Sequence, residues 1–185
     1  MVRAIMDGTK TQTRRVIKND RLNDNWVFSS FLEDGTAAFA RMWRGHHVET
    51  IHVKPKYKKG DIIWVRETFQ LVPFTHPHKY HGYAYRADWV GRDVEWRWKP
   101  SIFMPKDACR NFLKCTKVRV ERLQDISEKD AQAEGAMDMN SGVRGETDYR
   151  SGFENIWEAI NGRDSWDDNP FVFIYEFYLT EKPTQ

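Results

Sequence analysis

The chain has little cysteine and lacks any long apolar run. Cys109 and Cys115 are its only cysteines among 185 residues, too few for a disulfide framework or a cysteine zinc site. No apolar stretch approaches the roughly 20 residues that span a bilayer. The first residues are interrupted by Arg3 and Asp7, so they lack the apolar core of a signal peptide. These absences predict a cytoplasmic protein with reduced thiols and no membrane partner.

The chain has six histidines, and three that lie near one another do not form a metal-binding pattern. His76, His78 and His81 stand in a segment that Pro73 and Pro77 turn into a loop. A metal site usually needs three or four fixed ligands, and no acidic or cysteine partner is near in sequence. We expect a solvated loop there, and we expect neither a metal nor another cofactor.

Net charge is small, at +2, but the charges are unevenly distributed. Residues 1–120 contain 23 Lys and Arg against 12 Asp and Glu, whereas residues 121–185 contain 6 against 15. The basic part includes the run 54–59 (KPKYKK) and alternates with tryptophans. Basic side chains can bind phosphates while neighbouring aromatic rings stack on bases, so this combination suits a nucleic-acid ligand. Two oppositely charged faces that attract one another across the fold explain the asymmetry equally well.

Aromatic residues are plentiful at 14% of the chain, with eight tryptophans, which argues against disorder. The length fits one domain with a real core. Glu33, Asp34 and Gly35 between two apolar runs predict a hairpin turn. Alternating patterns predict strands at residues 26–32, 36–42, 61–69, 80–88, 111–123 and 171–179.

Two helices are expected in the acidic part. Ser127, with Asp130 three residues later, is typical of a helix N-terminus. Apolar residues within 153–160 lie on one helical face, and Gly162 ends that helix. Residues 140–150, rich in Gly, Ser and charge, predict a mobile loop. Many short strands with few helices indicate a small β-barrel with α additions.

The densest group of reactive side chains is the segment 8–15 (GTKTQTRR). It combines a glycine, a lysine, threonine hydroxyls and two arginines in one turn. Glu134, near the end of the helix expected after Ser127, is the candidate partner for these groups.

Seven blocks in this order resemble the ASCH family of the PUA-like superfamily, in its larger phage- and prophage-associated branch. They are residues 7–15, 60–68, 85–88, 98–105, 118–134, 153–162 and 169–177. The first block, of form GxKxxTxR, is the hallmark of the family. The resemblance implies an α+β fold, a PUA-like small β-barrel with flanking helices and an inserted β-hairpin. It implies a single domain over residues 1–185, with insertions around 20–55 and 138–150.

The resemblance also implies chemistry on nucleosides or RNA. One small bacterial ASCH protein is an N4-acetylcytidine amidohydrolase, and Lys10, Thr13 and Glu134 match its catalytic lysine, threonine and glutamate. Other members of the family are associated with binding or cutting RNA. We expect a protein that acts on a modified pyrimidine nucleoside, or on RNA containing one, with N4-acetylcytidine deacetylation as the leading reaction. The alternatives are an RNA-binding module, a ribonuclease, and a phage accessory protein that binds a host protein.

The residue types fit amide hydrolysis, which needs a nucleophile, a proton acceptor and an oxyanion donor. Thr13 supplies a hydroxyl, and Lys10 accepts its proton if neutral, which requires a pKa about 3 below the ordinary ~10.4, or roughly 4 kcal/mol. Arg15 or a backbone N–H is the candidate oxyanion donor. Glu134 either donates a proton to the leaving nitrogen or orients the amine or a water. A structural turn with a solvated Lys10 is the alternative.

The remaining ligand-binding candidates are aromatic side chains that stand near cationic ones in the sequence. Trp64 and Arg66 share one face of an expected strand, with Glu67 opposite. A base stacked on an aromatic ring contributes about 1–3 kcal/mol. Core packing explains Trp64, and an ion pair explains Arg66, equally well. Trp98 and Ser101 are weaker candidates for the same pocket.

Two features depart from the family pattern. Relatives usually have a short apolar strand before the position of Met1, so either Met1 is an internal methionine or the barrel lacks its first strand. The loss of that strand would expose a sheet edge beside the site. Phe103 and Asp107 replace a frequent histidine and tryptophan, which predicts altered substrate choice if these positions touch the ligand.

Overall fold

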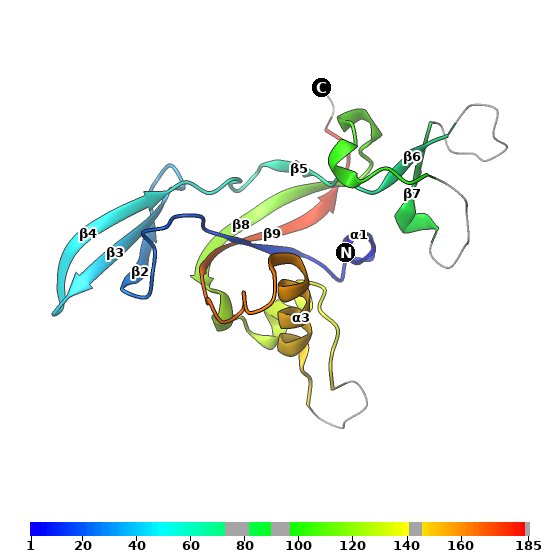
Figure 1. Ribbon diagram of the computed structural model, residues 1–185. Helices are drawn as coiled ribbons and strands as arrows, with labels where there is room; N and C mark the ends of the chain where they lie inside the picture. The colour runs from blue at the N-terminus through cyan, green and yellow to red at the C-terminus, as the bar shows by residue number, and fades with distance from the viewer. Residues whose placement is uncertain (73–81, 90–96, 141–145, 184–185) are drawn as a thin grey trace.

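The computed structural model describes residues 1–72, 82–89, 97–140 and 146–183. Its main sheet has the antiparallel order β1-β9-β8-β5. These strands are β1 (Gln12–Val16), β5 (Ile62–Trp64), β8 (Phe112–Arg122) and β9 (Phe171–Thr180). Strands β8 and β9 pair along nearly their whole length, with one register shift between Cys115 and Lys117. The sheet curls into a half-barrel (Figure 1).

Both faces of β9 are buried, because each packs against a different part of the chain. Phe173 and Tyr175 belong to a core cluster that also contains Phe39. Val172 and Ile174 point to the opposite face, where they pack with residues of the two longer helices. These helices are α2 (Glu128–Ala133) and α3 (Tyr149–Asn161). The main sheet therefore has one face that is covered by helices and a second face that packs against the cluster around Phe39.

The helix ends follow local signals in the sequence. The Ser127 side chain accepts a hydrogen bond from the backbone N–H of Asp130, at 3.1 Å, and caps α2. Asp148 caps α3 in the same way. The chain begins with α1 (Val2–Met6), and short 3-10 helices form at η1 (Arg86–Asp88), η2 (Ser101–Phe103), η3 (Lys106–Ala108) and η4 (Leu123–Asp125). Among the described residues, no helix is long and apolar enough to cross a membrane.

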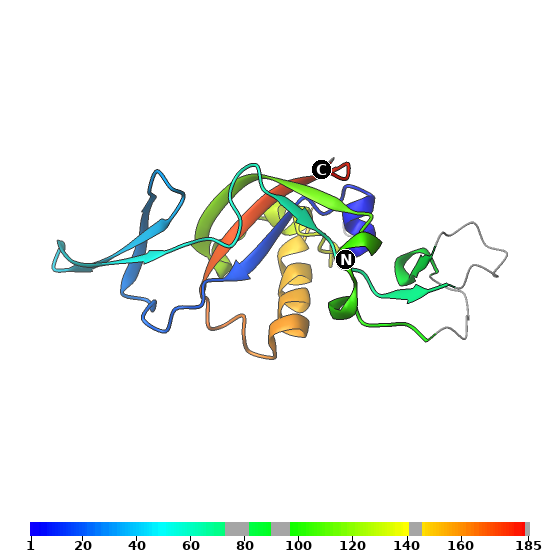
Figure 2. The same ribbon diagram turned by 90° about the horizontal axis from the view of Figure 1, so that it is seen from above.

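A second antiparallel sheet, which we call the arm, leaves the body on one side (Figure 1). It contains β2 (Trp26–Phe31), β3 (Ala37–Trp43) and β4 (His46–Val53). Its base is part of the core, because the Phe39 ring lies edge-on 5.0 Å from the Phe171 ring. A small sheet of β6 (Phe69–Leu71) and β7 (Tyr83–Tyr85) projects on the other side, as the view from above also shows (Figure 2).

The expected elements are largely present. The hairpin, the long strand at 111–123 and the last strand are confirmed, and a third strand, β4, extends the hairpin into a sheet. Helix α3 begins at Tyr149, inside the expected loop, of which residues 141–145 lie outside the described part.

The single strand expected at 61–69 is wrong, because the chain forms β5 and β6 with a break between them. In that break Glu67 is fully buried and binds Arg110 and Asn111. Of the stretch 80–88, the structure describes residues 82–88, where Tyr83–Tyr85 is a strand and η1 follows it.

Candidate functional site

The segment that contains Lys10 is fixed by backbone hydrogen bonds to two elements. The Lys10 N–H donates to the Ala4 carbonyl of α1 at 2.8 Å, and the Thr11 N–H donates to the Ala133 carbonyl at 2.8 Å. Lys10 and Glu134 form an isolated antiparallel bridge. The first block of the chain therefore lies directly against the C-terminal end of α2, although 124 residues separate the two.

Gly135 makes this close approach possible. Its φ is +80°, and a Cβ added there would lie 3.3 Å from the Lys10 Cβ and 3.4 Å from the Ala4 Cβ. A side chain would therefore meet both backbone strain and crowding. The glycine lets the chain turn immediately after Glu134, which is the C-cap residue of α2.

Lys10 and Glu134 form a buried ion pair. The Lys10 Nζ lies 2.7 Å from Glu134 Oε2 and donates a second hydrogen bond to the Glu134 carbonyl at 2.6 Å. Each residue is 5% exposed. Burial lowers the pKa of Lys10, Glu134 opposes that shift, and the charges of Arg15 and Arg14 add to it. The structure thus joins the two residues that the sequence analysis paired.

Arg14 binds the second carboxylate oxygen of Glu134 and so holds the ion pair in place. Its guanidinium donates to Glu134 Oε1 at 3.0 Å and also contacts Glu121 and Asp130. Arg14 is only 2% exposed. Arg14 was not among the predicted site residues, although strand alternation indicates its direction: Arg14 points to the opposite face of β1 from Thr13 and Arg15, toward the helix whose C-cap is Glu134.

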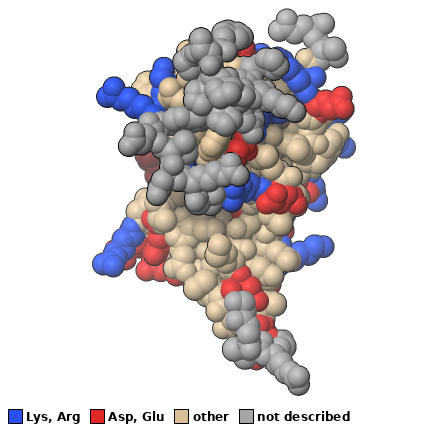
Figure 3. Space-filling view, turned by 90° about the vertical axis from the view of Figure 1, so that its right-hand side faces the viewer, with Lys and Arg blue, Asp and Glu red and all other residues tan. Residues whose placement is uncertain are grey.

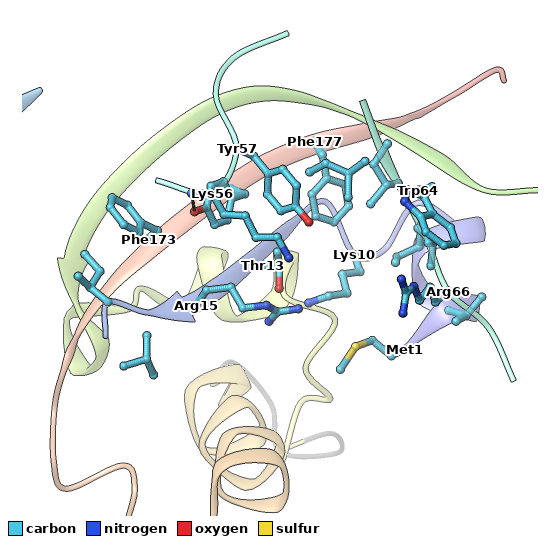
Figure 4. Close-up of a pocket in the computed structure, with 18 of the residues that line it drawn as sticks. Met1, Lys10, Thr13, Arg15, Lys56, Tyr57, Trp64, Arg66, Phe173 and Phe177 are labelled. Atoms are coloured by element: carbon cyan, nitrogen blue, oxygen red, sulfur yellow. Dashed lines mark hydrogen bonds between the residues drawn. The ribbon is translucent and has the colours of Figure 1, made fainter. Parts of the chain in front are cut away.

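A cavity of about 580 Å³ lies on the other face of β1. Thr13 and Arg15 line it, opposite Tyr175 and Phe173 in the β1–β9 register. Figure 4 shows Lys10, Thr13 and Arg15 pointing toward one another, with Lys56 above them. Other lining residues include Met1, Val2, Ile5, Lys18, Lys54, Tyr57, Ile63, Trp64, Arg66, Leu113 and Phe177.

Most of the predicted site residues gather at this cavity. Lys10, Thr13, Arg15, Trp64 and Arg66 line it. The Arg66 guanidinium lies 4.7 Å from the centroid of the Trp64 ring and donates to the Ile102 carbonyl at 3.0 Å. Among the described residues, Arg66 has no acidic partner within ion-pair distance.

The remaining candidates lie elsewhere. Glu134 is not a lining residue and holds Lys10 from the side away from the cavity. Trp98 and Phe103 line a separate cavity beside β6. Ser101 lies in η2, and neither it nor Asp107 is among the residues that line the cavity of Lys10.

Among the described residues, no group of three or more His, Cys, Asp or Glu is placed to hold a metal ion, and His76, His78 and His81 lie outside that part of the chain. The arrangement supplies a buried amine, a hydroxyl and a guanidinium at one wall of an aromatic cavity. Comparisons of the chain with protein-family models, curated proteins and solved structures find no match.

Proposed function

We propose that this chain is an ASCH protein with a PUA-like barrel. We propose that it binds a modified pyrimidine nucleoside in this cavity and removes an acyl group from the exocyclic nitrogen of the base. N4-acetylcytidine is the leading substrate. The observation that supports this proposal is the buried Lys10–Glu134 pair at the wall of a cavity that Thr13 and Arg15 also line. Three residues of the GxKxxTxR block line this cavity, and Glu134 binds one of them, Lys10.

Lys10 is the proposed base. Two positions of its tetrahedral nitrogen are used by hydrogen bonds to the Glu134 carboxylate and carbonyl. In the neutral amine, both N–H groups of Lys10 donate these two hydrogen bonds. The lone pair of the nitrogen is then free to accept a proton from another group. The lowered pKa of Lys10 favours this neutral form.

Thr13 is the proposed nucleophile. Lys10 takes the proton of the Thr13 hydroxyl as its oxygen bonds to the acetyl carbon, and Arg15 donates to the resulting oxyanion. The bond from carbon to N4 then breaks, and Lys10 returns its proton to N4, which releases cytidine. Water, activated by the same amine, hydrolyses the acetyl ester of Thr13 to acetate.

Glu134 orients Lys10 in this scheme. Its two carboxylate oxygens accept hydrogen bonds from Lys10 and Arg14, so neither is free to donate a proton into the cavity. Of the two roles considered for Glu134, orientation of the amine therefore fits better than acid catalysis. Arg14 contributes by holding the second oxygen.

The cavity has the size and lining for a nucleoside. Ligand pockets for small molecules usually measure about 300–1,000 Å³, and this one measures about 580 Å³. Tyr57, Trp64 and Phe173 offer ring faces or edges for a pyrimidine.

The test is to incubate the purified protein with N4-acetylcytidine and to quantify cytidine and acetate by chromatography. We expect turnover in the wild type and a loss of about 10²–10⁴-fold in Lys10→Met, because a general base is removed. Lys114→Met is the matched control, since Lys114 is an exposed lysine of β8 that does not line the cavity.

The absence of cytidine release by the wild type, or equal rates in Lys10→Met and Lys114→Met, would contradict the amidohydrolase. Binding of an acetylated oligonucleotide without turnover would then favour the RNA-binding module, and shortened oligonucleotides would favour the ribonuclease.

A further inference from the structure

The charge lining the cavity is of one sign. Among the described residues, six basic side chains line it and no acidic one does: Lys10, Arg15, Lys18, Lys54, Lys56 and Arg66. Lys10 is hydrogen-bonded to Glu134, so the positive charge of the cavity comes from the remaining side chains. None of the other five forms an ion pair with a described carboxylate. An uncharged nucleoside requires no such surplus of positive charge.

Four of these basic residues come from other segments of the chain than Trp64 and Arg66. Arg15 and Lys18 come from β1 and the residues just after it, and Lys54 and Lys56 come from the segment that follows β4. Two chain segments that are distant in sequence therefore bring their positive charges to the same rim. We call these four residues the basic rim.

The backbone of the basic rim is held in place. The Lys56 N–H donates to the Tyr175 hydroxyl at 3.0 Å, and the Tyr57 ring packs edge-on against Tyr175 at 5.4 Å. The Lys56 Nζ lies 5.3 Å from the centroid of the Tyr57 ring. In Figure 4 the Lys56 side chain extends toward Thr13 and Arg15. The rim is therefore tied to the same strand, β9, that pairs with β1.

We propose that the cavity takes a pyrimidine nucleotide rather than a free nucleoside, and that the three lysines of the basic rim bind its phosphate, while Arg15 faces the acyl group. The aromatic side chains around Thr13 suit the flat base, and the rim supplies charge-assisted donors for phosphate oxygens. The identity of the base rests on the proposed function; the phosphate rests on the charges alone. A terminal phosphate and a backbone phosphate of RNA share this chemistry.

The side chains of the basic rim are exposed, so salt screens their attraction for a phosphate. Lys56 is the best residue to change. Lys54 is less suitable because its charge also acts on Asp34, whose pKa is lowered mainly by hydrogen bonds from Thr36 and to a lesser extent by Lys54.

The experiment measures binding without requiring turnover. Isothermal titration compares cytidine with cytidine 5′-monophosphate at low salt and at about 0.5 M salt. We expect the monophosphate to bind about tenfold more tightly at low salt, a difference of about 1.4 kcal/mol, and the advantage to shrink at high salt. Lys56→Gln should weaken monophosphate binding about threefold or more and weaken cytidine binding by a smaller factor. Lys114→Gln should alter neither.

Equal affinities for cytidine and its monophosphate at low salt would overturn the phosphate site, as would an unchanged monophosphate affinity in Lys56→Gln. A cytidine trinucleotide separates the two sources of phosphate: tighter binding than the monophosphate identifies an RNA strand as the ligand, and equal or weaker binding identifies a mononucleotide.

Failure of this inference is distinguishable from failure of the proposed function. Salt-sensitive binding of the monophosphate in a protein that never deacetylates N4-acetylcytidine supports the phosphate site and contradicts the amidohydrolase. Turnover of N4-acetylcytidine with no preference for a phosphorylated form does the reverse.

Discussion

At the scale of single residues, Arg14 joins the helix-covered face of the sheet to the site. Its side chain is fully buried and contacts Glu134, Glu121 and Asp130. Arg14→Met leaves these carboxylates without their shared cation, and we expect it to lower the free energy of unfolding by about 3–5 kcal/mol. Urea denaturation monitored by circular dichroism measures this loss.

Arg15→Met is the matched control for that substitution. Arg15 is exposed, and among the described residues its side chain donates one hydrogen bond, to the Arg14 carbonyl at 2.8 Å. We expect its free energy of unfolding to change by no more than about 0.5 kcal/mol. Equal destabilisation by the two variants would contradict the role given to Arg14.

The lowered pKa of Lys10 predicts how its contribution to stability varies with pH. Burial lowers the pKa in the folded protein, so the unfolded chain binds more protons between the folded value and the ordinary ~10.4. The free energy of unfolding therefore rises with pH across that interval. The cost of a charged Lys10 is complete below the folded pKa and disappears above ~10.4.

Denaturation of the wild type and Lys10→Met between pH 7 and pH 10 tests this sign. We expect the stability of the wild type relative to the variant to increase with pH, and the rate of deacetylation to rise over the same interval as Lys10 loses its proton. A relative stability that falls with pH would show that Glu134 outweighs burial in setting the pKa of Lys10.

The sequence predicted the residues that line the cavity better than those behind it. Lys10, Thr13 and Arg15 stand in one short block, and their spacing alone connects them. Arg14 stands in the same block, but its partners Glu121 and Asp130 come from β8 and α2. Strand alternation indicates the face to which Arg14 points, but the identity of its partners depends on the packing of elements that are distant in sequence.

At the scale of elements, the junction between α2 and the first block depends on Gly135. Gly135→Ala places a Cβ 3.3 Å from the Lys10 Cβ at a φ of +80°. Strain from the left-handed backbone costs about 1–2 kcal/mol, and the contact with Lys10 adds to it. We expect a loss of stability above 2 kcal/mol, together with slower deacetylation, because the crowded neighbour is Lys10.

Gly8→Ala is the control that separates the cost of backbone strain from the cost of the close contact with Lys10. Gly8 has a similar φ of +72°, but a Cβ there meets no atom within 4 Å. We expect it to lose only the strain energy of about 1–2 kcal/mol in chemical denaturation. If Gly135→Ala is no more destabilising than Gly8→Ala, the close approach of Lys10 to the end of α2 does not limit the fold.

Elements with a strong local signal could be predicted, and those set by a distant partner could not. The turn at residues 33–35 and the cap at Ser127 both act within a few residues, and both are present. The break between β5 and β6 has no such signal. It occurs where Glu67 turns inward to Arg110, which is 43 residues away.

At the scale of the whole molecule, the uneven charge of the chain has two consequences. On the helix-covered face, Arg14 of the basic part pairs with acidic residues of the C-terminal part. On the cavity face, no described acidic residue lines the cavity beside the basic rim. The end with β6 and β7 has described side chains of both signs close together (Figure 3). The helix-covered face therefore shows internal attraction between the two parts, and the cations of the opposite face are the basis of the proposed phosphate site.

The arm and the body share a core, and this predicts that they unfold together. Phe39 of β3 is fully buried and lies edge-on to Phe28 of the arm and Phe171 of the body. Phe39→Ala should lower the free energy of unfolding by about 3–5 kcal/mol. Trp43→Ala, on the same strand but 68% exposed, should change it by no more than about 0.5 kcal/mol.

Tryptophan fluorescence and far-ultraviolet circular dichroism, followed through the same urea titration, measure both changes and their cooperativity. Trp26 belongs to the arm side of the shared core, and Trp157 packs on the helix-covered face. If arm and body are one folding unit, the two signals give one midpoint in the wild type and a single, lower midpoint in Phe39→Ala. An early fluorescence transition in Phe39→Ala, with the circular dichroism midpoint unchanged, would instead make the arm a separate unit that unfolds first.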